Sequence, residues 1–168
     1  MSRLAAPFLL LALAASACSF DPEVTGVWRT EDGATVSWPV LEFQGRVELV
    51  LGQYGEAVAG MLRLYEPEME FKEIYLFPAC PCLFLDQATF DNGTLVFDVI
   101  PCGAEATEWS GRFEWSEGDG GEILVGTLEP KVPAAGMEPT LQFKLRFSGG
   151  KKLIKEDELN QECPGPTL

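Results

Sequence analysis

The stretch TEWSGRFEWS, residues 107 to 116, alternates between apolar and polar side chains. Trp109 and Phe113 occupy one set of alternate positions, and Arg112 and Glu114 occupy the other. Successive side chains of a β-strand point to opposite faces, so this period of two predicts a strand with one buried apolar face and one charged face in solvent.

The same alternation recurs along the chain from residue 24 onward, and no helical periodicity competes with it. Turn residues interrupt it at the spacing typical of short strands. Asn92-Gly93 is the strongest turn signal, because a type I′ hairpin turn needs positive φ at both of its central residues. The expected strands are 24–31, 34–43, 46–52, 57–65, 70–78, 83–90, 94–100, 107–116, 122–129 and 140–147.

Short strands joined mainly by tight turns predict an antiparallel meander. An open meander exposes two edges of unpaired backbone groups, and only closure removes both edges. We therefore expect one all-β domain over 24–168, an antiparallel meander that closes into a lipocalin-like up-and-down β-barrel or a strongly curled sheet. Residues 151–162 are expected to add a short C-terminal helix. The inward side chains should include Trp28, Trp109, Phe113, Trp115, Phe143 and Phe147, whereas Arg112, Glu114, Lys144 and Arg146 should point outward.

The N-terminus has the form of a secretory signal peptide over residues 1–17. Arg3 precedes an apolar run from Leu4 to Leu13, and Ala15-Ser16-Ala17 supplies a cleavage pattern. The run is too short for a transmembrane helix, which needs about 20 apolar residues.

The residues at the cleavage point, Ala15-Ser16-Ala17-Cys18, resemble the lipobox of bacterial lipoproteins. In that family the cysteine is acylated and becomes the first residue of the mature chain. The resemblance implies lipid attachment at Cys18, a tether over 18–23 and a location in the cell envelope. Ser19 is similar to the residue found in lipoproteins that are sent on to the outer membrane. The alternative is an ordinary signal peptide followed by an unmodified cysteine.

With Cys18 lipidated, four cysteines remain, and an even number in an exported chain predicts two disulfides. A bond between Cys80 and Cys82 would close a ring around one residue, which conflicts with ordinary disulfide geometry. We expect one of this pair to bond Cys102 and the other Cys163. A Cys-x-Cys redox pair and a thiolate metal site are the alternatives, although no histidine is present to assist either.

Thr25-Gly26-Val27-Trp28 resembles the G-x-W signature of lipocalins and related up-and-down barrels. In that family the tryptophan closes one end of the barrel beneath an arginine from near the last strand, and Arg146 would match it. The alternative for Trp28 is an ordinary core tryptophan.

Composition excludes most classes of function. The chain has 12 Lys and Arg against 26 Asp and Glu, for a net charge of -14, which argues against binding nucleic acid or anionic lipid through charge. The absence of histidine excludes a Ser-His-Asp triad, a Cys-His dyad and any His-ligated zinc or haem. The acidic clusters at 66–73 and 117–122 lack the ligand spacing of a calcium loop. We therefore expect no enzymatic activity, no cofactor and no metal.

Two functions remain. In the first, the barrel holds a small apolar ligand in a pocket lined by inward residues such as Trp109, Phe113 and Phe143. In the second, the barrel is solid, and its outside binds or inhibits another envelope protein.

Overall fold

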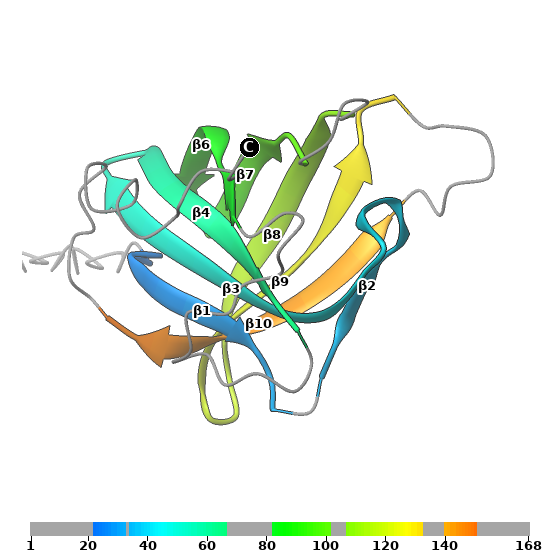
Figure 1. Ribbon diagram of the computed structural model, residues 1–168. Coiled ribbons are helices and arrows are strands. Elements are labelled where there is room, and N and C mark those ends of the chain that lie inside the picture. The colour runs from blue at the N-terminus through cyan, green and yellow to red at the C-terminus, as the bar shows by residue number, and fades with distance from the viewer. Residues whose placement is uncertain (1–21, 33, 67–81, 102–106, 133–139, 151–168) are drawn as a thin grey trace, which may run out of the picture.

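A computed structural model of the chain describes residues 22–32, 34–66, 82–101, 107–132 and 140–150 (Figure 1). These residues form an all-β structure, and no helix among them is long and apolar enough to cross a membrane. The elements are β1 (Gly26–Thr30), β2 (Val36–Trp38), the 3₁₀ helix η1 (Pro39–Leu41), β3 (Phe43–Tyr54), β4 (Ala57–Tyr65), β5 (Cys82–Phe84), β6 (Asp86–Asp91), β7 (Thr94–Val99), β8 (Trp109–Gly118), β9 (Gly121–Pro130) and β10 (Leu141–Gly149).

Eight of the described strands form a closed antiparallel ring. β1 pairs with β3 on one side and with β10 on the other, so the first and last strands lie together in Figure 1. The remaining neighbours follow chain order, from β3 to β4, β6, β7, β8, β9 and β10. The prediction of an antiparallel meander is confirmed, and the structure decides for a closed barrel.

β2 is an addition to this ring, and it differs from the strand expected over 34–43. Only Val36–Trp38 are extended there, and they pair with the first residues of β3. Pro39 then opens η1, because proline has no N–H to donate to a strand ladder. Glu42, with φ of 53°, redirects the chain into β3. The second half of that expected strand was wrong.

The strand expected over 83–90 is present as two pieces, β5 and β6, that both pair with β4. Leu83 lies opposite Leu62, whereas Thr89 lies opposite Ala57, so the register shifts by one residue between them. Gln87, with φ of 49°, occupies this bulge. The expected strand 70–78 and the expected helix 151–162 lie outside the described residues.

Because the strands alternate in direction, the barrel has two different ends. We call one the hairpin end: it carries the tight turns at 55–56, 92–93 and 119–120 and residues 22–25, which lead into β1. Asn92 and Gly93 have φ values of 49° and 80°, which confirms the predicted turn. We call the opposite end the connection end: it carries β2, η1, Ile100, Glu108 and residues 131–132.

The predicted division into inward and outward residues is largely confirmed. Arg112, Glu114 and Lys144 are exposed, and Arg146 is half-buried. Trp115 and Phe147 are also half-buried, so they cover the core only in part. The fully buried members of the predicted set are Trp28, Trp109, Phe113 and Phe143.

Gly126 lets the rings at the middle of the barrel approach its strand. It lies opposite Phe113 on β8 and opposite Phe143 on β10. A side chain at this position would collide with the carbonyl oxygen of Arg112 and with the Phe113 ring. The glycine therefore makes space for two large neighbours in one row.

Candidate functional site

The three residues expected to line a ligand pocket lie together, packed within an aromatic core. Phe113 stacks on Phe97 with ring centroids 5.6 Å apart, and it meets Phe143 at 5.8 Å. Trp109 packs edge-on against Trp38, with centroids 5.2 Å apart. These rings fill space inside the barrel by contacting one another.

Trp38, which the sequence analysis did not single out, closes the connection end. It comes from the short strand β2, it is completely buried, and it covers Trp109 from outside the ring of eight strands. The indole Nε1 atoms of Trp38 and Trp109 are buried, and neither has a hydrogen-bond partner among the described residues. The sequence signal that could have identified Trp38 is the alternation of Val36 and Trp38 with Ser37, which predicts that both apolar side chains face the core.

The G-x-W tryptophan closes the hairpin end, but the arginine expected above it points elsewhere. Trp28 is completely buried, and its Nε1 donates to the Val24 carbonyl at 2.9 Å. Its cross-strand neighbour is Phe147, whose ring it meets edge-on. Arg146 directly precedes Phe147 in the chain, so it projects from the opposite face of the strand. The expectation that Arg146 covers Trp28 was wrong.

On the outer face, Arg146 links three parts of the chain. Its Nη2 lies 2.6 Å from Oε1 of Glu31, and its Nη1 donates to the Asp119 carbonyl at 2.9 Å. Lys144 also contacts Glu31, at 3.0 Å. The bonds from Lys144 and Arg146 lower the pKa of Glu31.

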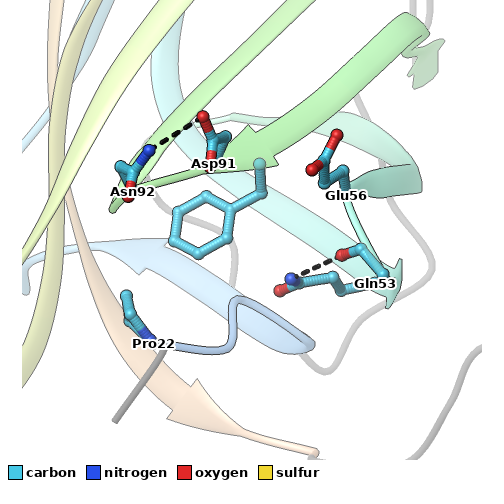
Figure 2. A pocket seen from close by; sticks show the side chains of 7 residues that line it. Pro22, Gln53, Glu56, Asp91 and Asn92 are labelled. Carbon is cyan, nitrogen blue, oxygen red and sulfur yellow. Dashed lines mark hydrogen bonds between the residues drawn. The ribbon is translucent and has the colours of Figure 1, made fainter. Parts of the chain in front are cut away.

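A pocket of about 440 Å³ lies at the hairpin end, between two turns and the chain that enters β1. Figure 2 shows Asp91 and Asn92 on one side of it and Gln53 and Glu56 on the other, with Pro22 at the edge. Gln53 Nε2 donates to the Gly55 carbonyl at 2.8 Å, and Asn92 Nδ2 donates to Asp91 at 2.9 Å. Phe90 also lines the pocket, but the carboxylate and amide groups around it do not suit a small apolar ligand.

The chain that enters β1 is fastened to this end of the barrel. Val24 N donates to Oε1 of Gln53 at 3.0 Å, and Gln53 N donates to Oγ1 of Thr25 at the same distance. Together with the bond from Trp28 to the Val24 carbonyl, these contacts fix residues 24 and 25 against the end of β3. The N-terminal part of the chain therefore leaves the barrel at a defined point.

A buried ion cluster, which we call the Glu48 cluster, lies on the outer face of β1, β3 and β4. Glu48 is only 2% exposed. It accepts bonds from Arg29 Nε at 2.6 Å, from Arg63 Nη1 at 3.0 Å and from the Tyr65 hydroxyl at 3.1 Å. Burial, followed by the negative charge of Glu48, raises the pKa of Tyr65 to about 12. Alternation alone predicts Glu48 as a solvated acid, because the sequence does not show which cations lie opposite it.

The connection end carries an exposed apolar pair beside a charged cluster. Ile100 is 61% exposed and Val132 is 72% exposed. Ile100 follows β7 and Val132 follows β9, and Lys131 Nζ contacts Asp98 at 2.7 Å and Glu108 at 2.9 Å across β8. These bonds, of which the one that Lys131 donates to Asp98 has the larger effect, raise the pKa of Lys131. We call Ile100 and Val132 the apolar pair.

The cysteine predictions stay untested. Cys82 begins β5 and is half-buried, whereas Cys18, Cys80, Cys102 and Cys163 lie outside the described residues. Across the described ranges, no group of three or more Asp, Glu or Cys side chains is placed to hold a metal ion.

Comparison of the chain with models of protein families, with curated proteins and with solved structures finds no match. The closed eight-stranded antiparallel ring is consistent with a lipocalin-like barrel.

Proposed function

We propose that this chain is a lipid-anchored, non-enzymatic binding protein of the bacterial cell envelope, and that it binds another envelope protein through its outer surface. Cys18 is the anchor in this proposal, and the outer membrane is its location. The packing of the barrel interior is the observation that favours a protein partner over a small apolar ligand.

The packed interior favours a macromolecular partner over an apolar ligand inside the barrel. A drug-sized ligand needs a pocket of several hundred Å³ lined mainly by apolar groups. The rings expected to line such a pocket instead pack against other rings. Trp109 contacts Trp38, and Phe113 contacts Phe97 and Phe143. The exposed fractions of Trp109, Phe113 and Phe143 are 1%, 0% and 2%.

The apolar pair gives the proposed partner a place to bind. Protein interfaces combine an apolar centre with a polar rim. Ile100 and Val132 supply the first, and the ion pairs of Lys131 supply the second. This patch lies at the connection end, away from the N-terminal attachment point.

The test of the anchor is the variant Cys18→Ser. We expect it to move the protein from the membrane fraction to the soluble envelope fraction, and we expect the mass of the wild-type N-terminal peptide to show acylation. An unmodified N-terminal peptide, or a variant that remains in the membrane fraction, contradicts the anchor.

The test of the binding surface is chemical cross-linking in cells, comparing Ile100→Asp and Val132→Asp with wild type. Val125→Asp is the matched control, because Val125 is an exposed valine on the outer face of β9, 45% exposed and outside the patch. We expect the cross-linked product to be lost in the first two variants and kept in the third. Equal cross-linking in all four proteins contradicts a partner at the connection end.

A second candidate function rests on the unpartnered indoles of Trp38 and Trp109. Each of these N–H groups can donate to an acceptor oxygen of a small molecule at the connection end. Native mass spectrometry of protein taken directly from the envelope tests this candidate. A bound small molecule that is lost in Trp109→Phe supports it, and ligand-free protein contradicts it.

A further inference from the structure

We infer that the hairpin end of the barrel faces the bilayer and that the connection end points away from it. This inference rests on the proposed lipid anchor, and it specifies which surface of the protein lies against lipid headgroups and which surface a partner can reach. Two independent observations carry it: the length of chain between Cys18 and the barrel, and the fastening of residues 24 and 25.

The chain between the anchor and the barrel is short. Only Ser19, Phe20 and Asp21 separate Cys18 from Pro22. A fully extended chain covers at most about 3.6 Å per residue, so the Cα atom of Pro22 lies no more than about 14 Å from that of Cys18. Pro22 lines the pocket at the hairpin end, together with Gly55, Glu56 and Asn92. An acylated Cys18 therefore holds this end close to the bilayer surface.

The attachment point cannot swing around the barrel, because the entering chain is bonded to β3. The hydrogen bonds between Val24 and Gln53 and between Gln53 and Thr25 hold it, and the indole of Trp28 holds the Val24 carbonyl from inside. A tether of this length thus acts on a fixed point of a rigid body. The strands of a barrel rise about 3.3 Å per residue and tilt by roughly 40°, so a ten-residue strand such as β9 places the connection end about 25 Å farther out.

The charges that the structure describes at the hairpin end do not supply this orientation. The described acidic residues at the hairpin end are Glu23, Glu56, Asp91, Glu117, Asp119 and Glu122, and Arg146 donates to the Asp119 carbonyl in one of these turns. Anionic lipid headgroups repel such a rim. We therefore assign the orientation to the short tether, and lengthening the tether should release it.

The experiment uses the full lipidated protein in vesicles that contain a lipid with a nitroxide on its headgroup. A fluorophore is attached to one added cysteine at a time, in Glu56→Cys and Glu117→Cys at the hairpin end and in Ser37→Cys and Gln142→Cys at the connection end. All four of these residues are exposed. We expect headgroup nitroxide to quench the first two fluorophores several-fold more than the second two.

A matched control inserts ten Gly and Ser residues between Phe20 and Asp21, which makes the tether flexible. We expect the difference between the two ends to shrink in this variant. An undiminished difference means that the short tether does not set the orientation, and it overturns the inference.

The acylation state of the N-terminal peptide is measured on the same samples. Acylated protein whose four fluorophores are quenched equally, or whose connection end is quenched more, overturns the orientation and leaves the anchor standing. Protein without acyl chains overturns the anchor and the orientation together.

Discussion

Trp28 in the first strand of the barrel packs edge-on against Phe147 in the last strand, with ring centroids 5.2 Å apart and an interplanar angle of 67°. The two residues are cross-strand neighbours in the pairing that closes the ring. The same register puts Arg29 opposite Arg146 on the outer face, where each arginine binds a glutamate. The pairing of β1 with β10 thus closes the barrel. Its register places Trp28 and Phe147 together at the hairpin end and directs both arginines to the outer face.

Replacement of Trp28 separates its two contributions. Trp28→Phe keeps an aromatic ring but leaves the buried Val24 carbonyl without its donor, so we expect a loss of about 1 to 3 kcal/mol in the free energy of unfolding. Trp28→Ala also loses the contact with Phe147, and we expect about 3 to 5 kcal/mol. Urea denaturation followed by circular dichroism measures both. Equal losses would show that the ring contact with Phe147 contributes nothing, and an unchanged Trp28→Phe protein would show the same for the indole hydrogen bond.

Gly126→Ala should destabilise the barrel, because the added methyl group meets the backbone of β8 as well as the Phe113 ring. Overpacking of this kind costs about 1 to 3 kcal/mol. The control is Gly118→Ala, whose added carbon meets nothing closer than the flexible end of Ile123 at 3.3 Å and should change stability by less than about 0.5 kcal/mol. A Gly126→Ala protein as stable as Gly118→Ala would contradict the close approach at the centre of the barrel.

Glu48→Gln should be strongly destabilising, because it removes the only negative charge that the described residues place between Arg29 and Arg63. Loss of one partner from a buried pair costs about 3 to 5 kcal/mol. Glu114→Gln is the matched control, since Glu114 pairs with Arg112 in solvent and such pairs contribute less than about 1 kcal/mol. Thermal unfolding of the two variants side by side makes the comparison, and similar melting temperatures would show that the Glu48 cluster is not buried in solution.

The Glu48 cluster should also make stability depend on alkaline pH. The pKa of Tyr65 is raised from 10.0 to about 12, so the unfolded chain loses this proton before the folded protein does. The contribution is fully present below pH 10, and it is lost as the pH rises from 10 toward 12. The expected loss is on the order of 3 kcal/mol at about 1.4 kcal/mol per pH unit. Tyr65→Phe should flatten this part of the pH profile of unfolding, and an unchanged slope in the variant would assign the dependence to other groups.

The four cysteines of the mature domain should be bonded in two pairs. We therefore expect an alkylating reagent to leave Cys80, Cys82, Cys102 and Cys163 unlabelled in denatured protein unless a reductant is added. Reduction should cost about 2 to 5 kcal/mol per bridge. Peptide mapping of the unreduced protein gives the pairing, and labelling of any of the four without reductant counts against two bridges.

The sequence by itself determined the strands and their faces. Alternation of large apolar with charged residues, as in Trp109 to Glu114, fixes which side of a strand is buried, and Asn92-Gly93 fixes a turn through its backbone conformation. Both signals depend only on residues close together in the chain. The structure contains the predicted strand and turn because these local preferences agree with the fold as a whole. Pro39 and Gln87 interrupt expected strands, and of these only the proline carries a signal that can be read from its covalent structure.

Only the tertiary structure decided which residues face each other across strands. The pairing of β1 with β10, which joins Trp28 to Phe147 and directs Arg146 to Glu31, depends on a register between segments from opposite ends of the chain. The same holds for Glu48, which alternation predicts to be solvated and which the register buries between two arginines. The covering of Trp109 by Trp38 also depends on where a three-residue strand folds back over the end of the barrel. Periodicity specifies the face of a residue, but contacts across the barrel depend on closure, which is a property of all eight strands together.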